Sequence, residues 1–298
     1  MASRLSHFTH KTSFFTSNPR RPSPPCMSVV LSTAPTQSYW ASIDAQIDAY
    51  LNKSIPIRSP ESVFEPMHHL TFAAPRTTAA SLCVAACELV GGDRDQAMAA
   101  AAAIHLMHAA AYTHEHLPLT DRPRPRPGIQ HKYNPNIELL TGDGIIPFGL
   151  ELLARSLDPA RSNPDKILRV IVEITRATGS QGMVDGQYQE LGLDQLGSEY
   201  DVIEYVCKKK EGELHACGAA CGAILGGGAE EEIESLRRFG LYAGMVQGIQ
   251  GKNKAGFMEE KIEKFKELAL KELESLQGKK TELISSLVEP SLAAVQIS

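Results

Sequence analysis

The stretch from Ala99 to Pro118 restricts most strongly what this chain can fold into. Five consecutive alanines, Ala99–Ala103, lead into the apolar segment Ile104–Ala111, and Pro118 ends the helix that this pattern predicts. Alanine has the highest helix propensity and lets neighbouring helices approach closely. Because aromatic residues make up only 6% of the chain, we expect packed helices and not a β-rich fold.

Polar side chains gather where this predicted helix ends. His114, Glu115 and His116 stand at its last turn, and Asp121 follows the proline. The end of a buried helix is where an all-α enzyme would hold a metal and carry out its chemistry. This cluster therefore needs to be tested as a candidate site.

The rest of the chain shows helical periodicity in most windows and sustained strand alternation in none. We therefore predict one all-α domain over residues 39–298. The stretch 179–200 is rich in glycine and polar residues and is predicted to be a surface loop. The expected helical segments are 43–51, 61–74, 77–90, 93–117, 135–157, 164–178, 203–225, 230–249, 262–273 and 283–288.

The first residues have the composition of a targeting segment. No Asp or Glu occurs before Asp44, whereas basic residues, Ser, Thr and Pro are frequent. This pattern is typical of a plastid transit peptide, which we place at residues 1–38 and expect to be disordered, with cleavage between Cys26 and Gln37. The alternative is a disordered tail without a targeting role. In the reducing plastid stroma, disulfide bonds are not expected.

Composition also excludes some classes of function. The formal net charge is −5, which argues against a nucleic-acid surface. Charged residues or histidines interrupt every apolar run before it reaches the length of a membrane span.

A metal site is one hypothesis for the histidines. His105 and His108 are three residues apart and share a helical face. Glu65 and His68 form one Glu-x-x-His pair, but a di-iron bundle requires two such pairs, and the sequence offers no convincing second. We expect these histidines to be hydrogen-bonded or partly buried without a metal, and keep a helical His/carboxylate metal enzyme as an alternative.

Two Cys-x-x-x-Cys pairs are the least expected feature. Cys83 and Cys87 form one pair, and Cys217 and Cys221 form the other. Four-residue spacing places both thiols of a pair on one helical face, about 6 Å apart, which suits neither a relaxed disulfide nor a zinc knuckle. The thiols are either small buried hydrophobic groups or part of a helix face shaped to accept a partner helix.

Four segments together resemble plant geranylgeranyl diphosphate synthases, and more narrowly the small-subunit branch of heteromeric geranyl diphosphate synthases. The similarity extends from about Tyr39 to Val288. The resemblance implies the all-α isoprenoid synthase bundle. The segments are Cys83-Val-Ala-Ala-Cys-Glu-Leu-Val-Gly-Gly92, His114-Glu-His-Leu-Pro118, Leu140-Thr-Gly-Asp143 and Gly222-Ala-Ile-Leu-Gly-Gly227.

The resemblance also implies that the catalytic motifs are degenerate. Catalytic members carry Asp-Asp-x-x-x-x-Asp, whose carboxylates hold magnesium against an allylic diphosphate. Here only Glu115 and Asp121 remain as carboxylates, because His116 replaces the second Asp. The segment 245–254, where the second aspartate-rich motif is expected, has no carboxylate, and Lys252 and Lys254 stand there instead.

The diphosphate-binding elements of the family are reduced in the same way. Of the element that binds isopentenyl diphosphate, only Arg76 keeps a charge. Lys210 matches the lysine of the family's Lys-Thr position, but Glu211 replaces the threonine. The paired arginines of the family have become the Pro-alternating Arg122–Pro127.

From these residues we expect no catalytic group and no metal held by this chain. By the resemblance, Cys83, Cys87, Cys217 and Cys221 are the subunit-interaction residues. The expected partner is a geranylgeranyl diphosphate synthase-like large subunit that binds magnesium, in a heterodimer or heterotetramer. The expected function is regulatory: to direct dimethylallyl and isopentenyl diphosphates to geranyl diphosphate for monoterpenes. A weakly active prenyltransferase is the alternative.

Overall fold

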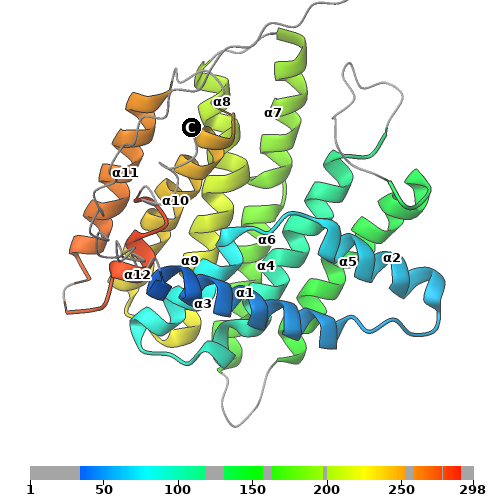
Figure 1. Cartoon of the computed structure of the whole chain (residues 1–298), viewed down its shortest axis with the longest axis horizontal. Coiled ribbons are helices and arrows are strands. Elements are labelled where there is room, and N and C mark those ends of the chain that lie inside the picture. Colours follow the sequence, from blue (N-terminus) through cyan, green and yellow to red (C-terminus); the bar gives the residue numbers. More distant parts are fainter. Residues whose placement is uncertain are drawn as a thin grey trace, which may run out of the picture. The chain divides into compact units, whose positions relative to one another are not determined.

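The computed structural model describes residues 34–118, 131–156, 163–196, 200–252, 258–276 and 278–289, and every regular element in these ranges is helical (Figure 1), which confirms the all-α prediction. The elements are α1 Ala34–Ser54, α2 Glu61–Ala73, α3 Thr78–Val90, α4 Arg94–Glu115, α5 Pro135–Arg155, α6 Pro164–Thr178, α7 Met183–Leu196, α8 Tyr200–Cys207, the π-helix η1 Lys208–Gly212, α9 Glu213–Gly226, α10 Glu230–Lys252, α11 Glu259–Glu274 and α12 Glu282–Ser285.

Local signals in the sequence set several helix ends. The Thr77 side chain accepts a hydrogen bond from the backbone at the start of α3, and Gly91 ends that helix with a positive φ of 106°. At the start of α4 the backbone N–H of Asp93 donates to the Gln96 side chain at 2.8 Å. Pro164 occupies the first turn of α6, where its fixed φ and missing N–H are tolerated.

The helix α9 packs against α3 through glycines. A Cβ atom built on Gly218 would lie 2.2 Å from the carbonyl oxygen of Ala79, and one on Gly222 would lie 1.9 Å from that of Cys83. Only glycine permits so close an approach of two backbones. Four-residue spacing places both glycines on the same face of α9, so the contact extends along the helix.

A second glycine contact joins α10 to the other side of α9 and to the preceding π-helix η1. A Cβ atom on Gly240 would lie 2.4 Å from the carbonyl oxygen of His215, and one on Gly244 would lie 2.4 Å from that of Glu211. The Phe239 side chain is fully buried beside this contact. Three helices therefore pack at backbone distance, and the larger side chains fill the space around them.

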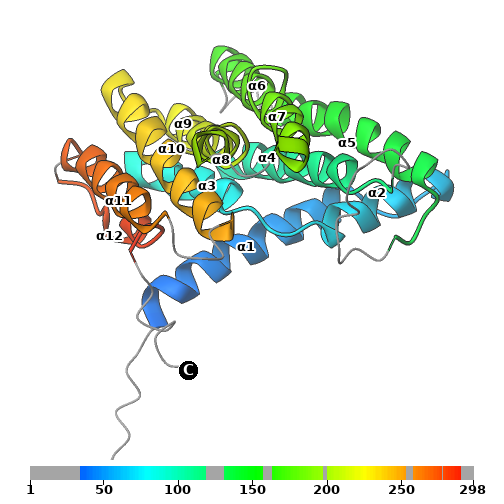
Figure 2. The same ribbon diagram turned by 90° about the horizontal axis from the view of Figure 1, so that it is seen from above.

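The other helices surround this centre. Ile43, Ile47 and Leu51 of α1 are buried, as their spacing predicted, and α1 packs against α3 and α4. This helix begins at Ala34, four residues before the end of the expected leader. Figure 2 shows α5, α6 and α7 along one edge of the bundle and α1 along the other.

The prediction of a surface loop over 179–200 is wrong, because α7 occupies Met183–Leu196. The helix was missed because, among its side chains that the structure describes (183–191), the inner side contains a single buried large hydrophobic residue, Met183, beside Gly186 and Glu190. These three positions have the spacing of one helical face, but their composition is that of a loop. The predicted helix 203–225 corresponds to α8, η1 and α9, which follow one another without a break. Its middle part is the π-helix η1.

The glycine contact between α3 and α9 makes a testable prediction. Gly222→Ala should lower the free energy of unfolding by about 1–3 kcal/mol or more, because the added methyl group meets a backbone carbonyl that cannot rotate away. Urea denaturation followed by circular dichroism measures the change.

Gly144→Ala in α5 is the matched control. Nothing lies within 4 Å of a Cβ atom built on Gly144, so this substitution should stabilise the chain by about 0.5–1 kcal/mol through helix propensity. Equal effects of the two substitutions would show that the α3–α9 contact is not sterically limited.

Candidate functional site

Four charged residues from four helical elements meet where the sequence placed the degenerate site. The Lys210 ammonium of η1 lies 2.7 Å from Glu115 Oε1 of α4 and 2.6 Å from Glu190 Oε2 of α7. Lys252 of α10 pairs with the other oxygen of Glu190. We call Glu115, Lys210, Glu190 and Lys252 the lysine–glutamate cluster.

The cluster is largely shielded from solvent. The side chains of Lys210, Glu115 and Glu190 are only 11–12% exposed. Burial by itself raises the pKa of Glu190, but the charges and hydrogen bonds of Lys210 and Lys252 outweigh this and lower the pKa to about 2. Glu190 is therefore an anion at neutral pH, and its charge is matched within the protein.

This arrangement does not fit a magnesium–diphosphate group. Magnesium needs carboxylate oxygens that are free to coordinate it, whereas ammonium groups already occupy oxygens of Glu115 and Glu190. Lys252 stands in the segment where a second set of carboxylates was expected, and a cation there repels a metal ion. Asp121, Lys254 and Arg122–Pro127 lie outside the described residues.

Arg76, the expected remnant of the isopentenyl diphosphate element, is engaged elsewhere. Its guanidinium pairs with Asp48 of α1, and this hydrogen bond raises the pKa of Arg76. The charge that could have bound a diphosphate is therefore neutralised within the chain. Both predicted diphosphate-binding remnants, Arg76 and Lys210, thus have carboxylate partners.

Two of the buried histidines, His105 and His215, form hydrogen bonds to backbone carbonyls. His105 Nε2 lies 3.1 Å from the carbonyl oxygen of Thr71, and His215 Nδ1 donates to that of Glu211 at 2.7 Å. Nε2 of His108 is buried without a partner, and burial lowers the pKa of His108 to about 4. Within the described ranges, no three His, Cys, Asp or Glu side chains are arranged to hold a metal ion.

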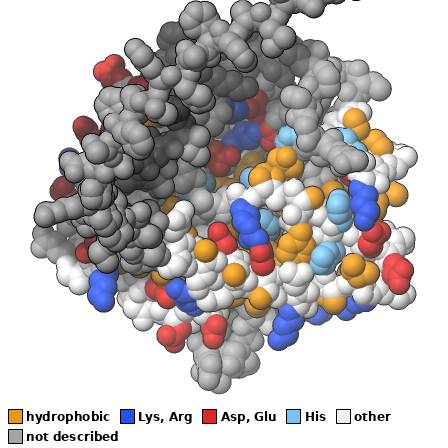
Figure 3. Space-filling view, viewed as in Figure 1, with side chains coloured by type: hydrophobic (Ala, Val, Ile, Leu, Met, Phe, Trp, Pro, Cys, Tyr) orange, Lys and Arg blue, Asp and Glu red, His pale blue; other side chains and the backbone are white. Residues whose placement is uncertain are grey.

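Histidines are also present at the surface. Figure 3 shows histidine side chains among hydrophobic ones on the part of the surface around α2. His116, at the position of the lost aspartate, bonds through Nδ1 to the carbonyl oxygen of Tyr112 at 2.8 Å and stacks on its ring. In this conformation it replaces neither the charge nor the geometry of a carboxylate ligand.

The two Cys-x-x-x-Cys motifs meet at the glycine contact between α3 and α9. Cys83, Cys87, Cys217 and Cys221 are each at most 2% exposed. The sulfur atoms of Cys217 and Cys221 lie 3.7 Å apart, and Cys87 Sγ donates to the backbone carbonyl of Asp93 at 3.4 Å. A role of these residues in subunit pairing must therefore act through the packing of α3 on α9.

Burial also suppresses the reactivity of these thiols. It raises the pKa of Cys87 to about 12 and that of Cys207 to about 11, and it raises the pKa of Cys83 and Cys221 well above the usual range. The thiolate is the reactive form of cysteine. Among the described cysteines, none forms a disulfide.

The outer sides of α5, α6 and α7 carry most of the large hydrophobic side chains that are exposed. On α6 and α7 these positions are three or four residues apart, so on each of these two helices they share one side. Figure 2 shows the two helices and α5 along one edge of the bundle. Exposed apolar side chains of this kind are candidates for an interaction surface. The residues are Ile137, Leu139, Leu140 and Ile146 of α5, Leu168 and Val172 of α6, and Val184, Tyr188 and Leu191 of α7. We call this surface the α5–α7 face.

A pocket of about 250 Å³ opens beside the α5–α7 face. Met107 of α4 and Met183 of α7 line it, together with Ile146 and Val184, which belong to the face itself. Apolar side chains therefore continue from the α5–α7 face into this pocket.

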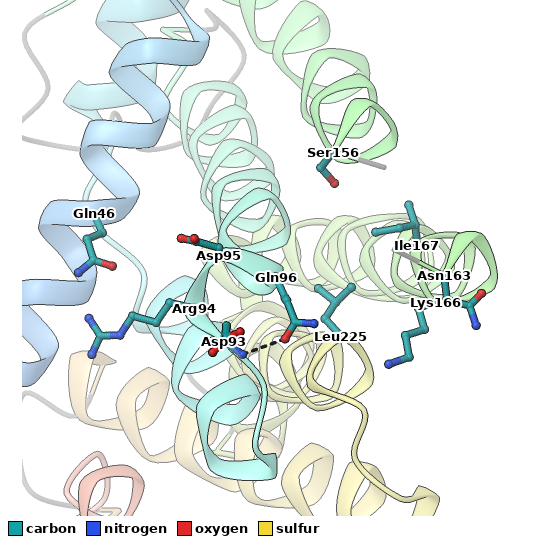
Figure 4. Close-up of a pocket in the computed structure, with 10 residues that line it drawn as sticks. All are labelled: Gln46, Asp93, Arg94, Asp95, Gln96, Ser156, Asn163, Lys166, Ile167 and Leu225. Carbon is teal, nitrogen blue, oxygen red and sulfur yellow. Dashed lines mark hydrogen bonds between the residues drawn. The ribbon is translucent and has the colours of Figure 1, made fainter. Parts of the chain in front are cut away.

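A second, more open pocket lies elsewhere in the described part of the chain. Its volume is about 920 Å³, and it lies between α1, the starts of α4 and α6, and the end of α9 (Figure 4). Asp93, Arg94, Asp95 and Lys166 line it, so it combines both signs of charge. It includes none of the predicted site residues.

The sequence indicated part of the site and missed the rest. It identified Glu115 and Lys210, and placed Lys252 near them, but it did not find Glu190 because that residue fell in the predicted loop. The helical spacing of Met183, Gly186 and Glu190 was the available signal.

Among the described residues, no helix combines the length and apolar character that a bilayer crossing requires.

Comparison with known proteins identifies the relatives of this chain. Residues 60–250 match the polyprenyl synthetase family model. The heterodimeric geranylgeranyl pyrophosphate synthase small subunit 2, chloroplastic, of Cannabis sativa is 54% identical over 259 residues, which cover 84% of this chain and 90% of that protein. The chloroplastic location of such relatives confirms the prediction of a plastid protein.

Solved structures confirm the expected fold type. The geranyl diphosphate synthase small subunit from Antirrhinum majus is 70% identical, with a TM-score of 0.81, and the match covers 86% of this chain and 99% of that chain. A chain of a mint heterotetrameric geranyl pyrophosphate synthase deletion mutant is 63% identical, with a TM-score of 0.79, over 85% of this chain and 100% of that chain.

The burial of the thiols predicts slow chemical modification. At neutral pH, iodoacetamide should label Cys83, Cys87, Cys217 and Cys221 about 100-fold or more slowly in the folded chain than in urea. The buried sulfurs are inaccessible, and the raised pKa of Cys83, Cys87 and Cys221 keeps those three thiols protonated. Peptide mass spectrometry measures the rate at each site. Rapid labelling of Cys217 or Cys221 in the folded chain would contradict the burial of the motif.

Proposed function

This chain belongs to the polyprenyl synthetase family, and we propose that it acts there as a non-catalytic regulatory small subunit. Its partner is a geranylgeranyl diphosphate synthase-type large subunit that binds magnesium, in a heterodimer or heterotetramer. Together they convert dimethylallyl and isopentenyl diphosphates to geranyl diphosphate, a precursor of monoterpenes. The observation that carries this proposal is the lysine–glutamate cluster.

The cluster supports the absence of catalysis by the chain alone. Ionising an allylic diphosphate requires magnesium ions and hydrogen-bond donors that stabilise a highly negative leaving group. One well-placed donor contributes about 3–4 kcal/mol, and a metal ion contributes several kcal/mol more. Here Lys210 and Lys252 neutralise the carboxylate of Glu190, and Asp48 neutralises Arg76.

The α5–α7 face supports the binding of a partner. Leu168, Val172 and Tyr188 expose 62%, 48% and 75% of their surface, respectively, and a protein without a partner rarely leaves such side chains together in water. A homologous large subunit would present helices of similar length, so helix-on-helix packing is the expected form of contact.

The two Cys-x-x-x-Cys motifs serve this pairing indirectly in our proposal. The backbone carbonyls of Cys83 and Cys87 lie against Gly222 and Gly226 of α9, and the Cys221 thiol of α9 lies beside the Val170 carbonyl of α6. Their small side chains set how closely these helices pack, and α6 carries part of the α5–α7 face. The proposed domain organisation remains a leader over 1–38 and one domain over 39–298.

The choice of product is supported by the names of relatives. The solved structures at 70% and 63% identity are named for geranyl diphosphate synthases, whereas the Cannabis sativa relative at 54% identity is named for geranylgeranyl pyrophosphate. Greater similarity to the first group favours geranyl diphosphate as the main product.

Purified chain alone and chain co-expressed with a plant geranylgeranyl diphosphate synthase test the function. With both C5 substrates and magnesium, the chain alone should form no product above background, and the pair should shift the main product from C20 to C10. The products are separated by chain length after dephosphorylation. Steady turnover by the chain alone would support a prenyltransferase in its own right, and an unchanged C20 product would contradict the regulatory role.

Substitutions on the α5–α7 face test the proposed interface. Leu168→Asp and Tyr188→Asp should each weaken binding to the large subunit about tenfold or more, because a buried apolar contact is replaced by an unpaired charge. Isothermal titration calorimetry measures the affinity. Leu270→Asp on α11, where 36% of the side chain is exposed, is the control and should bind as wild type; equal loss in all three variants would contradict this interface.

A further inference from the structure

The helix α7 is attached to the bundle in an unusual way. Met183 is its only residue in the main hydrophobic core among those whose side chains are described. A helix of 14 residues is marginal in water without tertiary contacts. Other interactions must therefore hold it in place.

Polar contacts provide this attachment along the inner side of α7. The hydroxyl of Tyr205 donates to Asp185 at 2.7 Å, and the Gln187 side chain donates to the backbone carbonyl of Ala111 in α4 at 3.1 Å. The Lys209 ammonium donates to the carbonyl oxygen of Gln181, just before the helix, at 2.5 Å. These bonds connect α7 to α4, α8 and η1.

The π-helix η1 packs directly on the backbone of α7. A Cβ atom built on Gly186 would lie 2.8 Å from Lys209 Cβ and 2.8 Å from Lys210 Cγ. The glycine therefore lets the stems of both lysines cross α7 closely. One turn later, Glu190 receives the ammonium groups of Lys210 and Lys252.

The opposite side of α7 is apolar and exposed. Val184, Tyr188 and Leu191 expose 51%, 75% and 41% of their surface, respectively. Their spacing of four and three residues places them on one side of the helix, away from Met183 and Glu190. One helix thus joins the lysine–glutamate cluster to the α5–α7 face.

We propose that Lys210 and Lys252 position α7 for binding to the partner subunit, through their ion pairs with Glu190. This inference rests on the proposed function, and it gives the lysines a role beyond blocking a metal. The ammonium groups of Lys210 and Lys252 take the place of a bound metal ion beside Glu190, so α7 is held in place without any ligand. Glu115 completes the attachment by fixing Lys210 to α4.

The exposure of the cluster supports a mechanical role. Because Glu190 is only 11% exposed, removal of both ammonium groups leaves a shielded and uncompensated carboxylate, which is strongly unfavourable. The least costly response is for α7 to move outward until water reaches Glu190. Such a movement would displace Tyr188 and its neighbours on the α5–α7 face.

The test compares Lys210→Gln/Lys252→Gln with wild type in two measurements. Hydrogen–deuterium exchange should show amide exchange in 183–191 faster by about tenfold or more, and the affinity for the large subunit should fall about tenfold. The single variants Lys210→Gln and Lys210→Arg are compared in the same two measurements. Lys210→Arg keeps the charge, so it should retain the slow exchange and the affinity that Lys210→Gln loses. Circular dichroism and thermal unfolding verify that each variant is folded.

Lys279→Gln is the matched control. Lys279 pairs with Glu232 at 2.6 Å and is 25% exposed, so this variant also removes one partly buried ion pair, but it does so away from α7. It should leave exchange in 183–191 and affinity unchanged. An equal effect of Lys279→Gln would overturn the proposal, because the effect would then reflect general destabilisation.

The outcomes separate this inference from the proposed function. If wild type does not bind the large subunit, the proposed function fails. If wild type binds and the double variant binds equally well, or loses affinity without faster exchange in α7, only the positioning role is overturned. Tyr188→Ala should lower affinity without changing exchange at the lysine–glutamate cluster, which distinguishes contact from positioning.

Discussion

The close approach of α3, α9 and α10 is the constraint on which the rest of the structure depends. Gly218 and Gly222 bring α9 onto the backbone of α3, and Gly240 and Gly244 bring α10 onto the other side of α9. At such distances, dispersion contacts and weak Cα–H···O bonds operate between backbones themselves. The thiols of the Cys-x-x-x-Cys motifs fit here because they are small and apolar enough to be buried between these helices.

This packing also determines which charges meet. The carbonyl of Glu211 lies against Gly244 of α10, and the π-helix that contains Glu211 directs Lys210 toward α4 and α7. A π-helical turn alters the direction of side chains relative to a regular α-helix and is frequent at functional sites. The lysine–glutamate cluster is therefore a consequence of how α9 and α10 pack.

The cluster links the two main features of this chain. On its inner side, internal ion pairs engage the carboxylates of Glu115 and Glu190. On its outer side it holds α7, whose exposed residues belong to the α5–α7 face. Loss of catalysis and gain of a partner surface would then be consequences of the same substitutions, because one shielded carboxylate, Glu190, needs a cation whether that cation is a metal or a lysine.

The sequence by itself determined the helical class, the family resemblance and the degeneracy of the catalytic motifs, because these depend on local periodicity and on residue types at fixed spacing. Helix ends such as Gly91 followed from local capping signals. The sequence did not predict α7, because polar contacts with distant residues hold that helix, and it left open whether the cysteines were buried or available to a partner. Only the tertiary structure decided that Lys210 meets Glu115, 95 residues away, and that Lys252 meets Glu190, 62 residues away. Ion pairs depend on distance in space, and the packing of distant helices sets that distance.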